Sequence, residues 1–252
     1  GYAADADRLT PVRRVYLDLL GLPPTYEQAR AFIDDKSADA YERLIDSCLE
    51  SPHYGERWGR HWLDVAGYAD SEGYTNDDRV RPYAYKYRDY VIRALNSDMP
   101  FDRFIQEQLA GDEMLVGPLK NLGPHQVQKL VATGFLRMAA DGTDSNPTDA
   151  AVAKNQVVAD TIKIVSSALL GLSVGCAQCH DHRYDPISQV DYYRVRAVFE
   201  PGYDWKAWRN PSQRRVSLYT DVQKAVRGEV QKEIDVVNKE KNAKQRKYIQ
   251  EA

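Results

Sequence analysis

The 252-residue sequence has only three cysteines, no large excess of either charge and no long apolar run. Its 34 Lys and Arg residues and 37 Asp and Glu residues leave a net charge of −3. A nucleic-acid-binding protein with a dominant basic surface is therefore disfavoured. The longest apolar stretch, around residues 164–174, falls well short of the roughly 20 residues that a membrane-spanning helix needs. The sequence thus predicts no transmembrane segment.

An initiator Met is also missing, as is the charged and then apolar opening of a signal peptide. The chain stops within a charged helical pattern. We therefore expect a processed or partial piece of a longer polypeptide, and the cellular compartment has to be inferred from chemistry rather than from a leader.

Alternation of apolar and polar residues, typical of a half-buried strand, is likewise absent. Apolar residues instead recur at helical spacing, and several of these segments end at Gly or Pro. Cys48 lies on one such apolar stripe, where a buried, inert thiol is expected. The segments are 8–20, 25–33, 39–49, 51–66, 83–95, 101–109, 126–136, 150–172 and 191–199. The pattern predicts a mainly α-helical fold, with residues 1–212 forming an irregular helical domain with long ordered loops.

Residues 213–252 are predicted to be a separate amphipathic, coiled-coil-like helix that begins a further region. Its apolar residues, from Leu218 to Val237, recur every three or four positions among many charges. Such a helix either packs on a partner segment or is one arm of an antiparallel hairpin. A solvated surface helix is an equally good interpretation.

Most of the chemistry in this sequence lies in Cys176-Ala-Gln-Cys179-His180, a C-x-x-C-H run. Two thiols three residues apart can both add to the vinyl groups of one haem, and the adjacent His is then held under the iron as an axial ligand. We expect one covalent haem c, with Cys176, Cys179 and His180 as its binding residues and His180 as the proximal iron ligand.

Three other chemistries use the same residues. A structural zinc site normally draws ligands from a second, distant pair, and Cys48 is the only other cysteine. A thioredoxin-like dithiol follows a strand, and none is predicted. A disulfide across two residues is strained. A zinc-stabilised interaction module remains the alternative from a different functional class.

Charged residues follow the motif directly. Arg183 is a candidate partner for a haem propionate. His182, with Asp181 and Arg183, is a candidate catalytic group that acts as an acid or base on the substrate side. The alternative is that Asp181 and His182 only cap and orient His180, as outer partners of metal ligands do.

The ligand on the opposite side of the iron decides between an electron carrier and a catalyst. His61 is the preferred candidate, because Trp58, Trp62 and Val65 give its helix an apolar side that suits a porphyrin. A single His on a helix is more often an ordinary core or surface residue. The other candidates are His53, His125, Met99, Met114 and Met138.

Two further features lie in or near the polar loop of residues 68–82. Asp70, Glu72, Asp77 and Asp78 offer the oxygen ligands that Ca²⁺ prefers, although their spacing is not that of an EF-hand and solvated carboxylates are the simpler interpretation. Six tyrosines form either helix packing or a wall for a polyhydroxylated ligand such as a polysaccharide. They are Tyr68, Tyr74, Tyr83, Tyr85, Tyr87 and Tyr90.

Motifs spread over residues 8–200 resemble the planctomycete cytochrome-associated domain of unknown function. The sequence departs from that family at Gly67, where an Arg is usual, and residues 141–149 carry no family signature. In chain order the motifs are YLDLLGLPPT (16–25), SPHYGERWGRHWLD (51–64), YADS (68–71), RPYAYKYRD (81–89), EQLAGD (107–112), ATGFLR (132–137) and GCAQCHDHRYDPIS (175–188).

The resemblance implies c-type haem at the C-x-x-C-H run and a periplasmic or extracellular setting. In that family the domain lies between a cytochrome-c-like domain and a C-terminal partner domain of large exported proteins, so the expected partners are the rest of the polypeptide and a redox protein. Association with polysaccharide-degradation genes suggests redox chemistry connected with complex carbohydrates. We expect electron transfer, with a haem-dependent enzyme acting on carbohydrate as the alternative.

Overall fold

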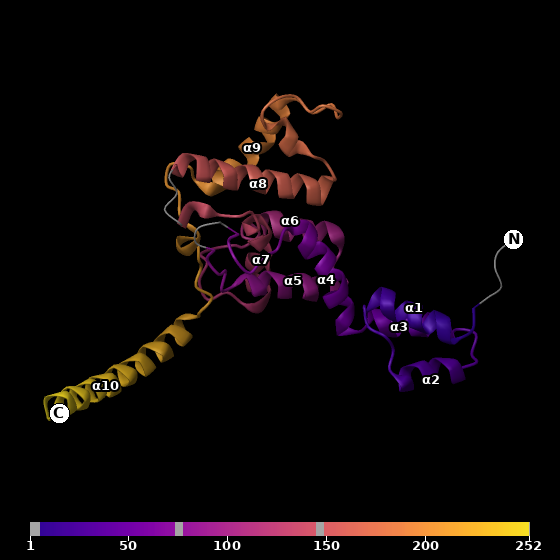
Figure 1. Ribbon diagram of the computed structural model, residues 1–252, viewed down its shortest axis with the longest axis horizontal. Coiled ribbons are helices and arrows are strands. Elements are labelled where there is room, and N and C mark those ends of the chain that lie inside the picture. The colour runs from indigo at the N-terminus through magenta and orange to yellow at the C-terminus, as the bar shows by residue number, and fades with distance from the viewer. Residues whose placement is uncertain (1–5, 74–77, 145–148, 252) are drawn as a thin grey trace.

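The computed structural model describes residues 6–73, 78–144 and 149–251, and within these ranges the chain is almost entirely helix and loop (Figure 1). The one β feature among them is an isolated bridge between Ser71 and Val80. The predicted mainly α-helical fold is confirmed. The α-helices are α1 (Leu9–Leu19), α2 (Tyr26–Asp34), α3 (Ala40–Leu49), α4 (Pro52–Ala66), α5 (Ala84–Asn96), α6 (Phe101–Ala110), α7 (Pro124–Ala132), α8 (Ala150–Leu170), α9 (Gln189–Tyr203) and α10 (Asp221–Glu251). The 3-10 helices are η1 (Thr133–Arg137), η2 (Gly142–Asp144), η3 (Val174–Gln178) and η4 (Pro211–Gln213).

Helices α1 to α3 form an N-terminal unit with a core of its own (Figure 1). Val12 and Tyr16 of α1 pack with Phe32 of α2 and with Leu44 and Cys48 of α3. Cys48 is only 1% exposed, and burial raises the pKa of its thiol. The structure thus makes Cys48 a core side chain, as its place on the apolar stripe predicts.

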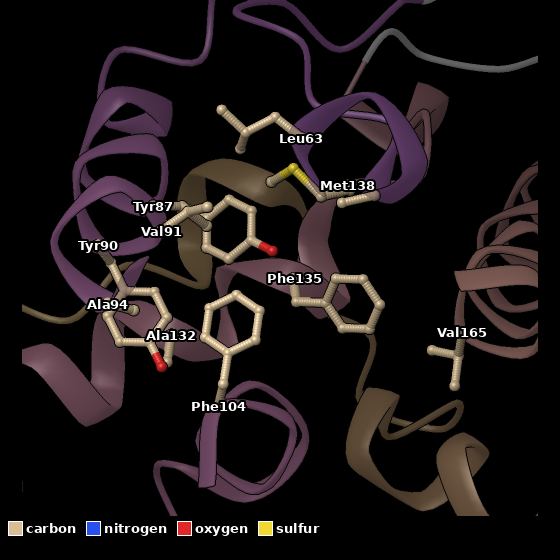
Figure 2. Packing of buried hydrophobic residues seen from close by; sticks show 11 residues of the cluster. Leu63, Tyr87, Tyr90, Val91, Ala94, Phe104, Ala132, Phe135, Met138 and Val165 are labelled. Carbon is tan, nitrogen blue, oxygen red and sulfur yellow. The ribbon is translucent and has the colours of Figure 1, made fainter. Parts of the chain in front are cut away.

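The central core lies among α4, α5, α6, α7, η1 and one face of α8. It is rich in aromatic rings. Figure 2 shows Tyr87, Tyr90, Phe104 and Phe135 gathered in this cluster, with Val165 approaching from α8. The rings of Tyr90 and Phe104 stack with centroids 5.9 Å apart. Burial of this many aromatic side chains holds α5 and α6 firmly against η1.

Helix α8 is shared between two cores. Val165 belongs to the central cluster, whereas Val158 and Ile162 pack with η3 and α9 in a third cluster. In Figure 1, α9 lies on one side of α8, and α4 to α6 lie on the other. This arrangement places the residues that follow α8 on the face turned away from α4.

Gly55 marks a close approach of α4 to α5. A Cβ at this position would lie 2.5 Å from the carbonyl oxygen of Ile92, and the Gly55 N–H donates to Asn96 Oδ1 at 2.7 Å. We expect Gly55→Ala to lower the free energy of unfolding by about 1–3 kcal/mol, because two backbones would have to separate. Urea denaturation measures this loss.

The matched control is Gly59→Ala, one turn further along α4. Its nearest neighbour would be the flexible side chain of Ile92, at 3.3 Å, so a far smaller loss is expected. Equal losses at both positions would contradict the close packing of α4 on α5.

The C-terminal α10 projects away from the helical body (Figure 1). Its described residues are exposed up to Gln250, including Val222, Val230 and Ile234. Its first residue is anchored, since Asp221 and Asn121 exchange hydrogen bonds of 2.7 and 2.8 Å. None of the helices in the described ranges combines the length and the apolar character needed to cross a membrane.

Candidate functional site

The two cysteines of the C-x-x-C-H run lie on either side of a buried residue, Ala177. They lie on η3 and just after it, packed against α8 and α9, where Ala177 is fully buried with Ile162 and Tyr192. Because Ala177 points into the protein, Cys176 and Cys179 on either side of it are exposed, and both are free thiols. The turn therefore presents two accessible sulfur atoms from one short segment.

His180 follows directly and is also exposed. Its Nδ1 lies 2.7 Å from the carbonyl oxygen of Asp181. A carbonyl can only accept, so Nδ1 carries the proton and Nε2 has a free lone pair. Histidine ligands of metals are commonly held in this way, with one ring nitrogen donating to a backbone carbonyl and the other left for the metal.

The segment after His180 is tied to the N-terminus of α9. Asp181 Oδ1 accepts from the backbone N–H of Gln189 at 2.8 Å, and Gln189 Nε2 donates to the Gln178 carbonyl at 3.1 Å. Ser188 caps α9 in a reciprocal pair with Asp191, and these hydrogen bonds lower the pKa of the Asp191 carboxyl. Asp181 thus connects the motif to a rigid helix.

His182 lies inside the loop rather than on its surface. Its side chain is 6% exposed. Nδ1 accepts from the backbone N–H of Asp185 at 2.8 Å, and Nε2 lies 2.9 Å from Ser173 Oγ. The structure therefore gives both ring nitrogens of this predicted acid or base a partner within the protein.

Arg183 is exposed, and its guanidinium lies 5.8 Å from the centre of the Tyr184 ring, itself 85% exposed. Within the described ranges no carboxylate lies at ion-pair distance from Arg183. A cation without a carboxylate partner, three residues from His180, is well suited to bind a propionate.

The structure does not bring His61 to this site. His61 lies on α4 at an apolar groove of about 330 Å³ that also includes Trp58 and Ala168. Ala168 packs against the central cluster, whereas Gly175 of η3 lies against Lys163 on another face of α8. His61 and His180 are thus on different sides of α8. The role of His61 as distal ligand stays a prediction, and this placement does not support it.

The element η3 packs on α8 and α9, whereas the other predicted distal candidates lie on other segments. His53 belongs to α4 and His125 to α7, while Met99 and Met138 pack in or against the central cluster. Met114 lies in the turn after α6. The described ranges contain every His and Met of the chain, and His182 is the one nearest to His180 in sequence.

Glu72, one of the predicted calcium ligands, forms an ion pair with an arginine. Its carboxylate lies 2.7 Å from Arg81 Nη2, and both side chains are about nine-tenths buried. Arg81 also donates to the carbonyl of Ala139 at 2.7 Å. The hydrogen bond from Arg81 to Ala139 connects the polar loop of residues 68–82 to the segment that follows η1.

Of the remaining carboxylates of the predicted calcium site, two accept hydrogen bonds from protein groups and one lies outside the described residues. Asp70 accepts from the Tyr68 hydroxyl at 2.7 Å, and Asp78 accepts from the Gly73 N–H at 2.9 Å. Asp77 lies outside the described residues. Within them no group of three or more His, Cys, Asp or Glu side chains is arranged to hold an ion.

The tyrosines beside this loop divide between core and surface. Tyr87 and Tyr90 are buried in the central cluster and cannot stack on a carbohydrate. Tyr83 and Tyr85 are exposed, whereas Tyr74 lies outside the described residues. A wall for a polysaccharide stays a prediction and no longer includes the two buried rings.

Sequence reasoning missed a buried charge cluster that connects Asp141 to η1 and to the segment before α10. Asp141 has a fully buried carboxylate, 3.3 Å from Arg137 and 3.2 Å from Arg214. It also accepts from Thr143, while Arg214 lies 4.5 Å from the centre of the Trp208 ring. Burial lowers the pKa of Arg214, and Arg137 lowers it further. Arg214 is far along the chain from Asp141, so sequence spacing gave no signal for this contact.

Comparison with known proteins agrees with the sequence motifs. A family model described as PSCyt2, protein of unknown function (DUF1549), matches residues 2–203. This match confirms the resemblance in its coarser form, as a domain of unknown function. No curated protein and no solved structure matches the chain.

Proposed function

The chain belongs to the PSCyt2 family of proteins of unknown function (DUF1549), and we propose that it is a c-type haem-binding redox domain that transfers electrons. The observation that carries this proposal is the turn of residues 176–180. It presents two exposed thiols together with a His whose Nε2 has a free lone pair. These are the groups that covalent haem attachment requires.

Cys176 and Cys179 would hold the haem through thioethers. In each attachment a thiol would add across a vinyl group: the S–H bond and the vinyl π bond break, and one S–C and one C–H bond form, without net oxidation. His180 Nε2 would bind the iron, and the Asp181 carbonyl holds the His180 ring in the required tautomer. Arg183 would pair with a propionate. Haem bound here would supply one-electron redox chemistry.

The proposed cellular location follows from this chemistry. Thioether attachment of haem is carried out outside the cytoplasm, so we propose a periplasmic or extracellular location within a larger exported protein. The other domains of that polypeptide and a redox protein would be its partners. The exposed valines of α10 fit an amphipathic helix that packs on one of these neighbours.

Zinc is the alternative for the same residues. A structural zinc site is almost always tetrahedral with four protein ligands, whereas haem needs one protein ligand on the iron. His182, the obvious further ligand, uses both ring nitrogens within the loop. The described residues thus favour haem over zinc.

A second candidate function is haem-dependent catalysis on a complex carbohydrate. It is favoured by one observation, namely that His61, the preferred distal candidate, lies in a groove with Ala168, on a different side of α8 from η3. An iron without a second ligand from this chain would be open to a small molecule or substrate.

An absorption spectrum of protein matured with the cytochrome c assembly machinery tests the proposal. We expect a pyridine haemochrome of haem c type with one haem per chain. Protein that contains zinc and no iron would overturn it. Within a haem protein, a high-spin spectrum that changes on addition of cyanide would favour the enzyme, and a low-spin spectrum unaffected by cyanide would favour the electron carrier.

His61→Ala is expected to leave the absorption spectrum of the haem unchanged, because His61 and His180 lie on different sides of α8. His180→Ala is the matched variant, and it should shift the Soret band through loss of the proximal ligand. Conversion from low-spin to high-spin by His61→Ala would instead identify His61 as the distal ligand.

A further inference from the structure

The side chain of His182 connects the two ends of the segment that carries the cysteines. One ring nitrogen, Nε2, contacts Ser173, which lies immediately before η3. The other, Nδ1, contacts the backbone of Tyr184 and Asp185 after the motif. The ring is nearly buried between these two stretches, with 6% of the side chain exposed.

These contacts fix the tautomer of the ring. The backbone N–H of Asp185 lies 2.8 Å from Nδ1 and can only donate, so Nδ1 accepts. A neutral imidazole then carries its proton on Nε2, which donates to Ser173 Oγ at 2.9 Å. The Asp185 carboxylate, 3.4 Å from Nδ1, and the Ser173 hydroxyl are the polar side chains that face the ring.

Ser173, which contacts the His182 ring, is also hydrogen-bonded to the first cysteine. Its carbonyl accepts from the backbone N–H of Cys176 at 3.0 Å, which opens the η3 turn. At the other end, the backbone N–H of His182 donates to the Ile187 carbonyl at 2.8 Å. The segment from Ser173 to His182 is therefore a loop closed by a single side-chain contact, and both thiols and His180 lie inside it.

We propose that His182 is a positioning residue that closes this loop and holds Cys176, Cys179 and His180 ready for haem. The inference rests on the proposed haem-binding function. Preorganising the loop removes conformational freedom that the thiols and the ligand would otherwise lose during attachment. It also fixes the direction in which His180 approaches the iron, which sets the strength of that bond.

This role differs from catalysis by His182 as an acid or base. A proton donor or acceptor needs a ring nitrogen within reach of the substrate. Both nitrogens of His182 are engaged within the loop, and its ring is almost inaccessible. The geometry therefore points to an indirect action through His180.

The test compares His182→Phe and Ser173→Ala in the full chain, each matured with the haem attachment machinery. Ser173 is exposed and lies outside the core, so Ser173→Ala removes the partner of Nε2 without disturbing packing. We expect each variant to retain the wild-type circular dichroism spectrum and to carry about tenfold less covalent haem, because the thiols and His180 are no longer preorganised. The haem that is attached should have a shifted reduction potential.

Combination and rescue separate positioning from a general loss of structure. The double variant should be no worse than His182→Phe alone, because His182→Phe already removes the contact with Ser173. Ser173→Thr, which keeps the hydroxyl, should restore haem attachment. His53→Phe, at an exposed His on α4, is the control and should behave as wild type.

Two results would overturn the inference, and they are distinguishable. Wild-type protein without haem would remove the proposed function and this role with it. If the wild-type protein carries haem, and the His182→Phe and Ser173→Ala variants match it in haem content and reduction potential, only the positioning role is removed.

Discussion

Replacement of both Cys176 and Cys179 by serine is expected to abolish covalent haem attachment without unfolding the protein. Both side chains are exposed and form no disulfide, so neither contributes to a core. Surface substitutions of this kind change the free energy of unfolding by about 0.5 kcal/mol or less. Thermal unfolding of the haem-free protein and a haem stain on a denaturing gel measure the two quantities separately.

The third cysteine supplies the control. Cys48 is 1% exposed in the core of α1 to α3, remote in sequence from the motif. Cys48→Ser should retain full haem attachment and lose about 1–3 kcal/mol of stability, because a hydroxyl replaces a buried thiol. Substitution of the exposed cysteines thus removes haem attachment and preserves stability, whereas substitution of the buried Cys48 preserves haem attachment and lowers stability. Covalent haem in the Cys176→Ser, Cys179→Ser variant would contradict the assignment of the attachment site.

Asp141→Asn is expected to cause the largest loss of stability among single substitutions. The carboxylate is fully buried and is the ion-pair partner of Arg137 and Arg214. Removal of its charge leaves two guanidinium groups close together without compensation, which costs about 3–5 kcal/mol. Because Arg214 also lies against Trp208, the segment that leads to α10 should loosen at the same time.

Hydrogen exchange followed by mass spectrometry measures this effect, with increased exchange expected in residues 205–216. Asp34→Asn is the matched control, since Asp34 forms an exposed ion pair with Arg30 on α2. A change of no more than about 1 kcal/mol is expected there. Similar stability losses for the two variants would contradict a structural role for the buried cluster.

Local sequence patterns predicted the helices well. The apolar spacing in residues 8–20 and 39–49 corresponds to α1 and α3, and Pro and Ser at the start of α4 mark its beginning. These features depend on neighbouring residues along the chain, which is why one sequence suffices to find them. The pattern in residues 126–136 predicts one helix, whereas the structure divides this segment into α7 and the 3-10 helix η1.

Contacts between distant segments could not be predicted in the same way. The pairing of Arg214 with Asp141, and the two-faced packing of α8, depend on how the chain folds back on itself. The same limit applies to His61, because an apolar face on α4 does not reveal which side of α8 it covers. In the motif itself, the exposed cysteines follow from the buried Ala177 between them, but the sequence alone did not show that Ser173 contacts His182.

Attachment of one haem at residues 176–180 can be located by peptide mapping with mass spectrometry, on protein matured with the attachment machinery and then digested. We expect a peptide containing Cys176, Cys179 and His180 that carries the mass of one haem bound through two thioethers, and an unmodified Cys48 peptide. Recovery of the 176–180 peptide with both thiols free and alkylatable would contradict it.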